Sequence, residues 1–462
     1  RKPHAIMLPY PYQGHINPFA RLAVNLAAEG FTVTFVNTRS VDGRISRARG
    51  DGGDIFGGAR DSGLDIRYAT VCDGFPLSFD RVLNHDRFVE GLIHVFPAHV
   101  DEFFDNLAGD DPPATCLISD TFYVWGSAIA RKHNLVYVSF WTEPALVFSL
   151  YYHLELLINN GDFDSSGQNN LKKKKETMIH YIPGVEAINP TDLPSYLQSQ
   201  TTTVVHRVIF KAFDDVKKAD MIICNTVQKL EEETLSALHR KQPTYAVGPI
   251  ISDVFTASLW SESDCSDWLS AKPKGSVLYV SFGSHAGTTS RNTISEISLG
   301  LLMSEVNFIW VIRPDIVGDE DSTSIFPDGF NDCLGERGLI VRWCNQFKVL
   351  SDPAIGGFLS HCGWNSVLES IRFKVPIICF PLFTDQFTNR RLVVNDWKVG
   401  INLCDRGRVT REEVREKIRF VIGEETSEVL RKSMADVGGI FDEALRLNGS
   451  SVQNFKLFIE EL

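Results

Sequence analysis

Residues Trp343 to Gln386 read WCNQFKVLSDPAIGGFLSHCGWNSVLESIRFKVPIICFPLFTDQ, and this stretch decides the fold class of the chain. An apolar run at 355–360 is followed by a polar loop, a segment with helical spacing and a second apolar run at 375–380. Strands and helices that alternate in this way are typical of a parallel β-sheet with helices on both faces. The small and polar residues at the helix start could also offer backbone N–H groups to a phosphorylated ligand.

The same alternation extends over the rest of the chain. Asn17-Pro18 is typical of a helix start, Gly30 of a helix end, and 122–133 of a second helix. Two such systems, with a seam that begins at 245–250, predict an α/β protein of two parallel-sheet domains. The apolar runs predict strands at 4–9, 31–36, 115–119, 136–140, 276–282, 307–312, 339–343, 355–360 and 375–380.

The composition limits the class of protein. A length of 462 residues suggests two or three domains, and 44% hydrophobic residues are enough for sizeable cores. The net charge of −12 argues against nucleic acid or an anionic membrane as the main partner. We expect no membrane span and no signal peptide, because no apolar run has the required length or position. The nine cysteines form no C-x-x-C pair, which favours reduced thiols in a cytoplasmic protein. The stretches 49–60 and 162–176 predict loops.

Polar side chains follow the predicted strands at the points where those strands end. In an open parallel sheet, ligands bind outside the carboxyl ends of the strands, so these side chains are the candidates for a binding site. If two sheets face each other across a cleft, all of these groups point into it. They are His15, Asp120, Thr142, Ser284, His361, Asp385 and Gln386.

Each candidate also has a purely structural interpretation. His15 could donate to a carbonyl group in a turn, and Asp120 could cap the helix that follows it. As a pair they are more specific, because a carboxylate on one ring nitrogen orients a histidine and makes it more basic. Ser366 and Glu369 match a capping box, which would explain both residues without a ligand. Trp343 on its own is more typical of a core residue than of a stacking surface.

A dinucleotide-binding enzyme would show G-x-G-x-x-G directly after its first strand. The first predicted turn of this chain holds only Gly14. A nicotinamide-dependent oxidoreductase is therefore a remote alternative.

The stretch 343–386 resembles the signature box of plant secondary-product glycosyltransferases, the family-1 enzymes that use UDP-sugars. The resemblance lies in its length, in HCGWNS at 361–366 with Glu369, and in the final Asp385-Gln386. The chain departs from the family pattern at Glu143 and at 285–289. Further segments follow the order of the family: GHINP at 14–18, ISDTFYVW at 118–125, SFWTEPA at 139–145, IPGVEAINPTDLP at 182–194, CNTVQKLE at 224–231, VGPI at 247–250 and SFGS at 281–284.

The resemblance implies a GT-B fold, in which two Rossmann-like domains face each other across a cleft. Residues 1–244 would bind the acceptor, with 441–462 packing back on them, and 251–440 would bind the UDP-sugar. His15 would be the catalytic base and Asp120 its partner. The other implied roles are as follows: Trp343 stacks on uracil, the backbone of Cys344 and the side chain of Gln346 hold the nucleoside, Glu369 holds the ribose, His361, Asn365, Ser366 and Ser284 hold the diphosphate, and Thr142, Trp364, Asp385 and Gln386 contact the sugar.

The implied function is the inverting transfer of glucose from UDP-glucose to a hydroxyl group of a small lipophilic plant metabolite, such as a flavonoid, phenol or terpenoid. A glutamine at the end of the box goes with glucose in this family, so Gln386 favours UDP-glucose. No metal would be needed, because helix N–H groups would stabilise the departing UDP. The alternatives are a nucleotide-sugar binding protein without transferase activity, and the transfer of another sugar. We expect a monomer, with Phe75, Phe122, Trp141 and 150–152 as candidates to line the acceptor pocket.

Overall fold

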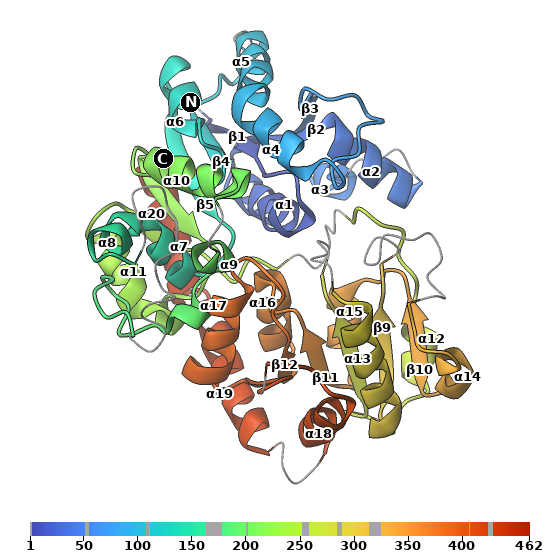
Figure 1. Ribbon diagram of the computed structural model, residues 1–462. Helices are drawn as coiled ribbons and strands as arrows, with labels where there is room; N and C mark the ends of the chain where they lie inside the picture. The colour runs from blue at the N-terminus through green and yellow to red at the C-terminus, as the bar shows by residue number, and fades with distance from the viewer. Residues whose placement is uncertain are drawn as a thin grey trace. The chain divides into compact units, whose positions relative to one another are not determined.

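The computed structural model describes residues 2–50, 55–107, 109, 111–162, 178–199, 202–251, 258–283, 289–313, 325–405, 407–423 and 428–462. The chain divides into two compact units, Arg1–Trp260 with Ala444–Leu462, and Ser261–Glu443. Each unit is built on one parallel sheet (Figure 1). Ser284, and 163–176 of the predicted second loop, lie outside the described residues.

The first unit contains a seven-stranded sheet in the order β3-β2-β1-β4-β5-β6-β7. Its strands are β1 (His4–Leu8), β2 (Thr32–Thr38), β3 (Ile66–Val71), β4 (Cys116–Asp120), β5 (Val136–Trp141), β6 (Met221–Cys224) and β7 (Thr244–Ala246). Its helices are α1 (Gln13–Ala28), α2 (Arg39–Arg49), α3 (Gly57–Asp61), α4 (His85–His94), α5 (Phe96–Asn106), α6 (Gly126–Lys132), α7 (Ala145–Tyr152), α8 (Leu154–Asn159), α9 (Ser195–Gln198), α10 (Val204–Val216), α11 (Glu232–His239) and α20 (Ser450–Glu461).

Alternate residues of the strands serve two apolar layers, one on each face of this sheet. Ala5 and Met7 of β1 pack with Phe19 of α1, whereas Ile6 and Leu8 pack with helices α4 to α6 on the other face. Because successive side chains of a strand point to opposite faces, a strand buried on both sides must be apolar throughout. This explains why HAIML reads as a continuous apolar run after its histidine.

The second unit contains a six-stranded sheet in the order β10-β9-β8-β11-β12-β13. Its strands are β8 (Val277–Ser281), β9 (Asn307–Val311), β10 (Gly338–Val341), β11 (Ile355–Ser360), β12 (Ile377–Cys379) and β13 (Gly400–Asn402). Its helices are α12 (Ser266–Ser270), α13 (Arg291–Ser304), α14 (Phe330–Leu334), α15 (Gln346–Ser351), α16 (Trp364–Arg372), α17 (Gln386–Arg391), α18 (Arg411–Ile422) and α19 (Glu428–Ala444).

Both sheets have the strand order of a doubly wound fold. In the first sheet the order reverses between β1 and β4, and in the second between β8 and β11. Ligands of such sheets bind at the carboxyl ends of the two strands where the order reverses. The topology alone therefore directs attention to the residues after β1 and β4, and to those after β8 and β11.

Several predicted boundaries were wrong. Helix α1 begins at Gln13 and not at Asn17, so Pro18 lies inside the helix and His15 lies in its first turn. The predicted helix at 122–133 begins only at Gly126, because the chain turns between Asp120, the last residue of β4, and Trp125. Part of the predicted loop 49–60 is helical, since α3 occupies Gly57–Asp61.

The last residues of the first unit lie later in the chain than the predicted seam. Residues Thr244–Ala246 form β7 of the first sheet, and Val247, Ile250 and Leu259 belong to the apolar layer around α1. The final helix α20 packs beside β7. Asn454 of α20 donates to the Ala246 carbonyl at 2.9 Å, and Tyr245 donates to Glu461 at 2.6 Å.

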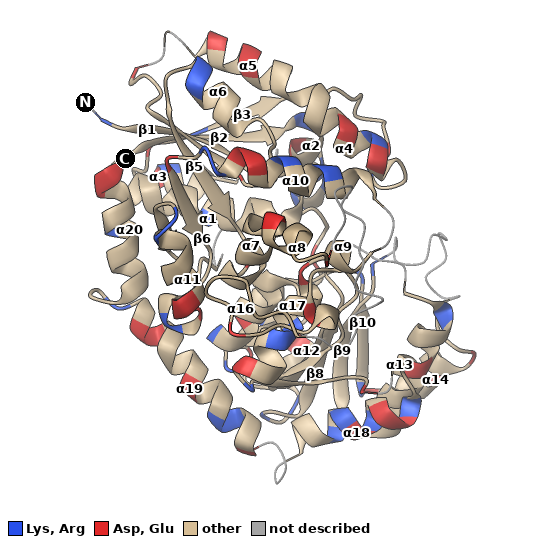
Figure 2. Cartoon of the chain, turned by 60° about the vertical axis from the view of Figure 1, so that its left-hand side comes forward, with Lys and Arg blue, Asp and Glu red and all other residues tan. Residues whose placement is uncertain are grey.

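Charged residues of both signs are interspersed over the surface helices, as α4 and α18 illustrate in Figure 2. The net charge of −12 is thus spread over mixed-sign, solvated helix faces. In the parts of the chain that the structure describes, no helix is long and apolar enough to cross a membrane.

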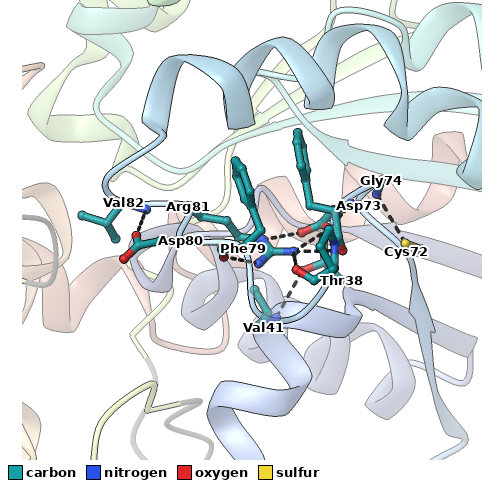
Figure 3. Close-up of polar contacts among 11 residues, drawn as sticks. Thr38, Val41, Cys72, Asp73, Gly74, Phe79, Asp80, Arg81 and Val82 are labelled. Atoms are coloured by element: carbon teal, nitrogen blue, oxygen red, sulfur yellow. Dashed lines mark hydrogen bonds and ion pairs between the residues drawn. The ribbon is translucent and has the colours of Figure 1, made fainter.

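The loop that follows β3 is held by a buried ion pair (Figure 3). Arg81 donates to both carboxylate oxygens of Asp73, at 2.7 and 2.8 Å, and to the carbonyl of Phe79 at 2.9 Å. The side chain of Asp73 is 2% exposed and that of Arg81 is 14% exposed. Asp73 also accepts from the Phe75 N–H at 3.1 Å, so a single carboxylate fixes the shape of the loop.

The Arg81→Met variant is expected to lower the stability of the first unit by about 3 kcal/mol, because it leaves the Asp73 carboxylate buried without its partner. This corresponds to roughly 6–12 °C in the midpoint of thermal unfolding. The double variant Asp73→Asn with Arg81→Met should lose less, because no buried charge is then left. A single variant as stable as the wild type would contradict this account of the loop.

Candidate active site

The residues at the reversal point of the first sheet form a histidine–carboxylate pair. His15, in the first turn of α1, follows β1, and Asp120 is the last residue of β4. The Nδ1 atom of His15 lies 2.7 Å from Oδ2 of Asp120. Thr142 follows β5, and its Oγ1 lies 3.1 Å from the same Nδ1. Three of the predicted residues are therefore brought together within one unit.

Both oxygens of Asp120 are engaged, which leaves it a supporting role. Oδ2 faces His15, and Oδ1 accepts from the N–H of Phe122 at 3.0 Å. The side chain of Asp120 is 2% exposed, whereas that of His15 is 16% exposed. An ionised carboxylate only accepts hydrogen bonds, so the proton of a neutral imidazole is held on Nδ1. Nε2 is then the basic nitrogen, which is the arrangement that a general base requires.

Aromatic side chains surround His15. The rings of Tyr10 and Phe122 each have their centroid 5.7 Å from that of the imidazole. Among the predicted acceptor-pocket residues, Trp141 and 150–151 are buried in the core, whereas Phe75, Phe122 and Tyr152 are half-buried. The partly exposed rings are the ones that could also contact a ligand.

In the second unit, Gln346 connects two residues of α16. It is the first residue of α15, and its Nε2 donates to Oγ of Ser366 at 2.9 Å and to Oε2 of Glu369 at 2.7 Å. The predicted capping box at Ser366 and Glu369 was wrong, because the residue that caps α16 is Gly363. Residues three apart on a helix share one face, so the two side chains lie together beside Gln346.

Burial makes the carboxyl group of Glu369 a weaker acid than usual. It raises the pKa of this carboxyl group from 4.5 to about 7, although the hydrogen bond from Gln346 acts in the opposite direction. A carboxyl group whose pKa is raised in the folded state makes the protein less stable as the pH rises from the pKa of the unfolded state to that of the folded state. Glu369 is therefore held against a cost that grows between about pH 4.5 and 7.

We expect the Glu369→Gln variant to be more stable than the wild type at pH 8, by up to about 3 kcal/mol, and nearly equal to it at pH 4.5. Glu296→Gln is the matched control. The ion pair with Arg411 lowers the pKa of Glu296, so its replacement should reduce stability at pH 8. Thermal unfolding of the three proteins over this pH range measures both effects, and a Glu369→Gln gain that does not grow with pH would contradict the assignment.

His361 lies at the reversal point of the second sheet, in a narrow space between two glycines. It follows β11 directly and is 8% exposed. A Cβ atom at Gly283 or at Gly363 would lie under 3.0 Å from Nε2 of His361, so a side chain at either position would displace the imidazole. Gly283 also has a positive φ of 83°. Among the described residues, Nδ1 of His361 has no hydrogen-bond partner, which leaves it available to a ligand.

Gln386 is oriented by its backbone neighbours. Its Oε1 accepts from the N–H groups of Leu382 and Phe383, at 2.8 and 3.1 Å. The side-chain oxygen is thereby occupied, and the amide nitrogen remains as the group that can donate to a ligand. Asp385 precedes α17, and its Oδ2 accepts from Asn389 at 2.5 Å.

Asn389 also donates to the carbonyl of Cys362 at 2.9 Å, and so connects the loop of His361 with the loop of Gln386. Both loops contain a non-glycine residue with positive φ, namely Cys362 at 65° and Thr384 at 57°. Strained residues of this kind persist where surrounding contacts hold them, and they cluster at functional sites. Neither Asn389 nor this connection was predicted from the sequence.

The remaining predicted residues lie around α15 and α16. Trp343 is half-buried, and its carbonyl accepts from Ser263 at 2.8 Å. Cys344 is 3% exposed, with its sulfur 3.7 Å from the hydroxyl group of Tyr279. Trp364 begins α16 and packs against Trp397 at 5.9 Å between ring centroids, and Asn365 follows it, half-buried.

The prediction from strand ends also missed Arg313. This residue lies two positions after β9 and is 1% exposed. Its Nη1 donates to the carbonyl of Gly283 at 2.7 Å. A charged residue at the end of an otherwise apolar run was the signal that could have revealed it.

One cluster of possible metal ligands exists among the residues that the structure describes, formed by Asp101, Asp105 and His133. Lys132 donates to Asp101 at 2.6 Å, and His133 lies 2.9 Å from the same carboxylate. These contacts account for the cluster without a metal.

The two doubly wound sheets and their polar residues define a protein that binds a nucleotide-linked ligand, and the comparisons with known proteins specify the class. The family model described as UDP-glucoronosyl and UDP-glucosyl transferase matches residues 261–434. UDP-glycosyltransferase 86A1 of Arabidopsis thaliana is 56% identical, over 100% of this chain and 95% of that protein. The 7-deoxyloganetin glucosyltransferase of Catharanthus roseus is 34% identical, over 100% of this chain and 97% of that protein.

Solved structures agree with the fold. The crystal structure of TcCGT1 in complex with UDP has a TM-score of 0.84 at 26% identity, covering 100% of this chain and 99% of that one. Medicago truncatula UGT71G1 complexed with UDP-glucose has a TM-score of 0.82 at 23% identity, covering 100% and 98%. The predicted fold class of two Rossmann-like units, as in GT-B proteins, is confirmed.

The chain belongs to the plant family-1 UDP-glycosyltransferases. It is therefore an enzyme that transfers a sugar from a UDP-sugar co-substrate to an acceptor, and the alternative of a binding protein without transferase activity is wrong.

Proposed function

We propose that this enzyme transfers glucose from UDP-glucose to a hydroxyl group of a small lipophilic plant metabolite, with inversion at the anomeric carbon. The observation that carries the proposal is the hydrogen bond of 2.7 Å between His15 and the buried Asp120. His15 removes the hydroxyl proton through Nε2 as the acceptor oxygen attacks the sugar. Asp120 stabilises the imidazolium that forms.

The proposed inversion is supported by the contacts of Asp120. One route to retention uses a carboxylate that attacks the anomeric carbon and forms a covalent sugar–enzyme intermediate. Asp120 is 2% exposed and both of its oxygens are engaged, so it is not placed to act as such a nucleophile. A single displacement turns the α-linked sugar of the donor into a β-glucoside. The proton coupling at the anomeric position of the product, measured by NMR, tests this; an α-linked product would exclude it.

We further propose that the second unit binds the UDP-sugar and the first unit binds the acceptor. Trp343 stacks on uracil, with the backbone of Cys344 and the side chain of Gln346 beside it. Glu369 accepts from the ribose hydroxyl groups, and the N-terminus of α16 with His361 holds the diphosphate. The roles proposed for the remaining residues are diphosphate contacts for Asn365, Ser366 and Ser284, and sugar contacts for Thr142, Trp364, Asp385 and Gln386.

The Gln386→Glu variant tests the sugar contact. A glutamate lacks the amide N–H group, and its charge would face the backbone N–H groups that now hold Oε1. We expect kcat/KM for UDP-glucose to fall about 10- to 100-fold, with UDP binding unchanged. Initial rates with UDP-glucose and UDP-galactose, together with UDP titration, measure the effect. Unchanged turnover of UDP-glucose would remove Gln386 from the sugar site, and faster turnover of UDP-galactose in the wild type would exclude glucose as the preferred sugar.

The acceptor class is supported by the aromatic surroundings of His15 and by the name of the 34% identical relative, a 7-deoxyloganetin glucosyltransferase. Apolar walls with a few polar groups are typical of sites for small lipophilic ligands. A mass-spectrometric screen of flavonoids, phenols, terpenoids, sugars and peptides with UDP-glucose tests the proposal. Products confined to sugars or peptides would contradict it.

The nine free cysteines, six of them buried, favour the cytoplasm as the place of action.

A further inference from the structure

Arg313 is a buried cation beside the proposed diphosphate site. It follows β9, which neighbours β8 in the sheet, and its side chain is 1% exposed. Its Nη1 donates to the carbonyl of Gly283 at 2.7 Å, and Gly283 is one of the two glycines that border His361. An arginine stays charged even when buried, so a positive charge is fixed behind this turn.

His361 itself does not supply positive charge at neutral pH. Burial and the neighbouring Arg313 lower the pKa of its imidazole from 6.5 to about 4. The ring is therefore neutral and acts only as a hydrogen-bonding group. A diphosphate that enters this site without a metal needs a permanent cation or oriented N–H groups to balance its charge.

We propose that Arg313 is a positioning residue for the UDP-sugar: it holds the Gly283 turn against His361 and provides the permanent positive charge that favours a diphosphate over an uncharged nucleoside. This inference rests on the proposed donor site in the second unit. Its basis is geometric. Arg313 contacts Gly283, and Gly283 in turn contacts His361, beside the point where the strand order of the second sheet reverses.

A purely structural role for Arg313 makes a different prediction. If the guanidinium only satisfied the carbonyl of Gly283, its loss would loosen the turn and weaken every ligand of this unit alike. If Arg313 has the proposed role, loss of its charge should lower the affinity for each ligand according to the phosphate charge of that ligand. The ratio of the affinities for UDP and uridine separates the two roles, because uridine has the nucleoside without the phosphates.

The test is calorimetric titration of UDP and of uridine into the full chain and its variants. Arg313→Gln and Arg313→Met remove the charge, and Arg313→Lys keeps it on a shorter, unforked group. Arg419→Gln is the matched control; Arg419 is 50% exposed and donates to the Ser304 carbonyl at 3.1 Å. It removes one positive charge from the same unit, away from the site.

For the neutral variants, we expect UDP to bind roughly 10- to 100-fold more weakly and uridine to bind within about 3-fold of the wild type. The lysine variant should lose about 3- to 10-fold for UDP alone, and the control should match the wild type. Parallel losses for both ligands, or an unchanged affinity for UDP, would overturn the proposal. If neither neutral variant folds, the lysine variant decides by the same criterion. A wild-type protein that binds no UDP would instead refute the proposed donor site.

Discussion

The His15→Ala variant should retain UDP affinity and lose turnover by about a hundred- to ten-thousand-fold, which is the range of general acid–base catalysis. Asp120 contacts Nδ1 of the imidazole at 2.7 Å, which leaves Nε2 for the proposed role of base. The side chain is 16% exposed and lies in the first turn of α1, so its removal leaves the core of the first unit intact.

Steady-state rates with an acceptor that the wild type glucosylates measure turnover. Titration of UDP into the same sample measures the affinity for UDP. A second variant, His15→Gln, keeps a polar group of similar reach and serves as the control for packing. Turnover within tenfold of the wild type in both variants would remove His15 as the base. Loss of UDP binding together with turnover would indicate that the substitution had damaged the protein more widely.

The Asp120→Asn variant should lower kcat roughly a thousandfold, although it changes a residue that does not touch the substrate. An asparagine can present its NH2 group to Nδ1, which stabilises the tautomer with the proton on Nε2 and removes the base. The amide oxygen can still accept from the Phe122 N–H, so the turn after β4 is expected to persist.

Thr142→Val is the matched control for this prediction. The Oγ1 of Thr142 lies 3.1 Å from the same Nδ1, and valine has nearly the same shape without the hydroxyl group. If the carboxylate alone orients the ring, this variant should retain kcat at saturating UDP-glucose within about tenfold, and the loss of its proposed sugar contact should appear in KM. Comparable losses in the two variants, or an Asp120→Asn enzyme close to the wild type, would contradict the role given to Asp120.

The sequence allowed the class of fold to be predicted because strands buried on both faces are apolar throughout and stand out as runs. Four strands were not predicted, for physical reasons. Strand β3 is half-buried at the edge of its sheet and includes polar residues, and β6, β7 and β13 have only three or four residues. Such segments depend on their neighbours in the sheet and carry little pattern of their own.

The pairing of His15 with Asp120 could be predicted because the strand-end rule depends on topology and not on side-chain detail. The start of α1 could not, since Pro18 is tolerated inside the helix although it removes one backbone hydrogen bond. The capping-box interpretation of Ser366 was wrong because its residue type suits a cap, whereas Gly363 occupies that position. Arg313 was overlooked because burial of a charge depends on tertiary contacts that no local pattern encodes.

The central claim is that His15 takes the proton of the acceptor hydroxyl, and a series of acceptors of graded acidity tests it most directly. We predict that His15→Ala shows the whole hundred- to ten-thousand-fold loss of turnover with an acceptor whose hydroxyl group is weakly acidic. With a nitrophenol the loss should be much smaller, because this acceptor is largely ionised near neutral pH and needs no base. An equal loss of turnover over the whole series would contradict the claim, because the role of His15 would then not depend on the proton of the acceptor.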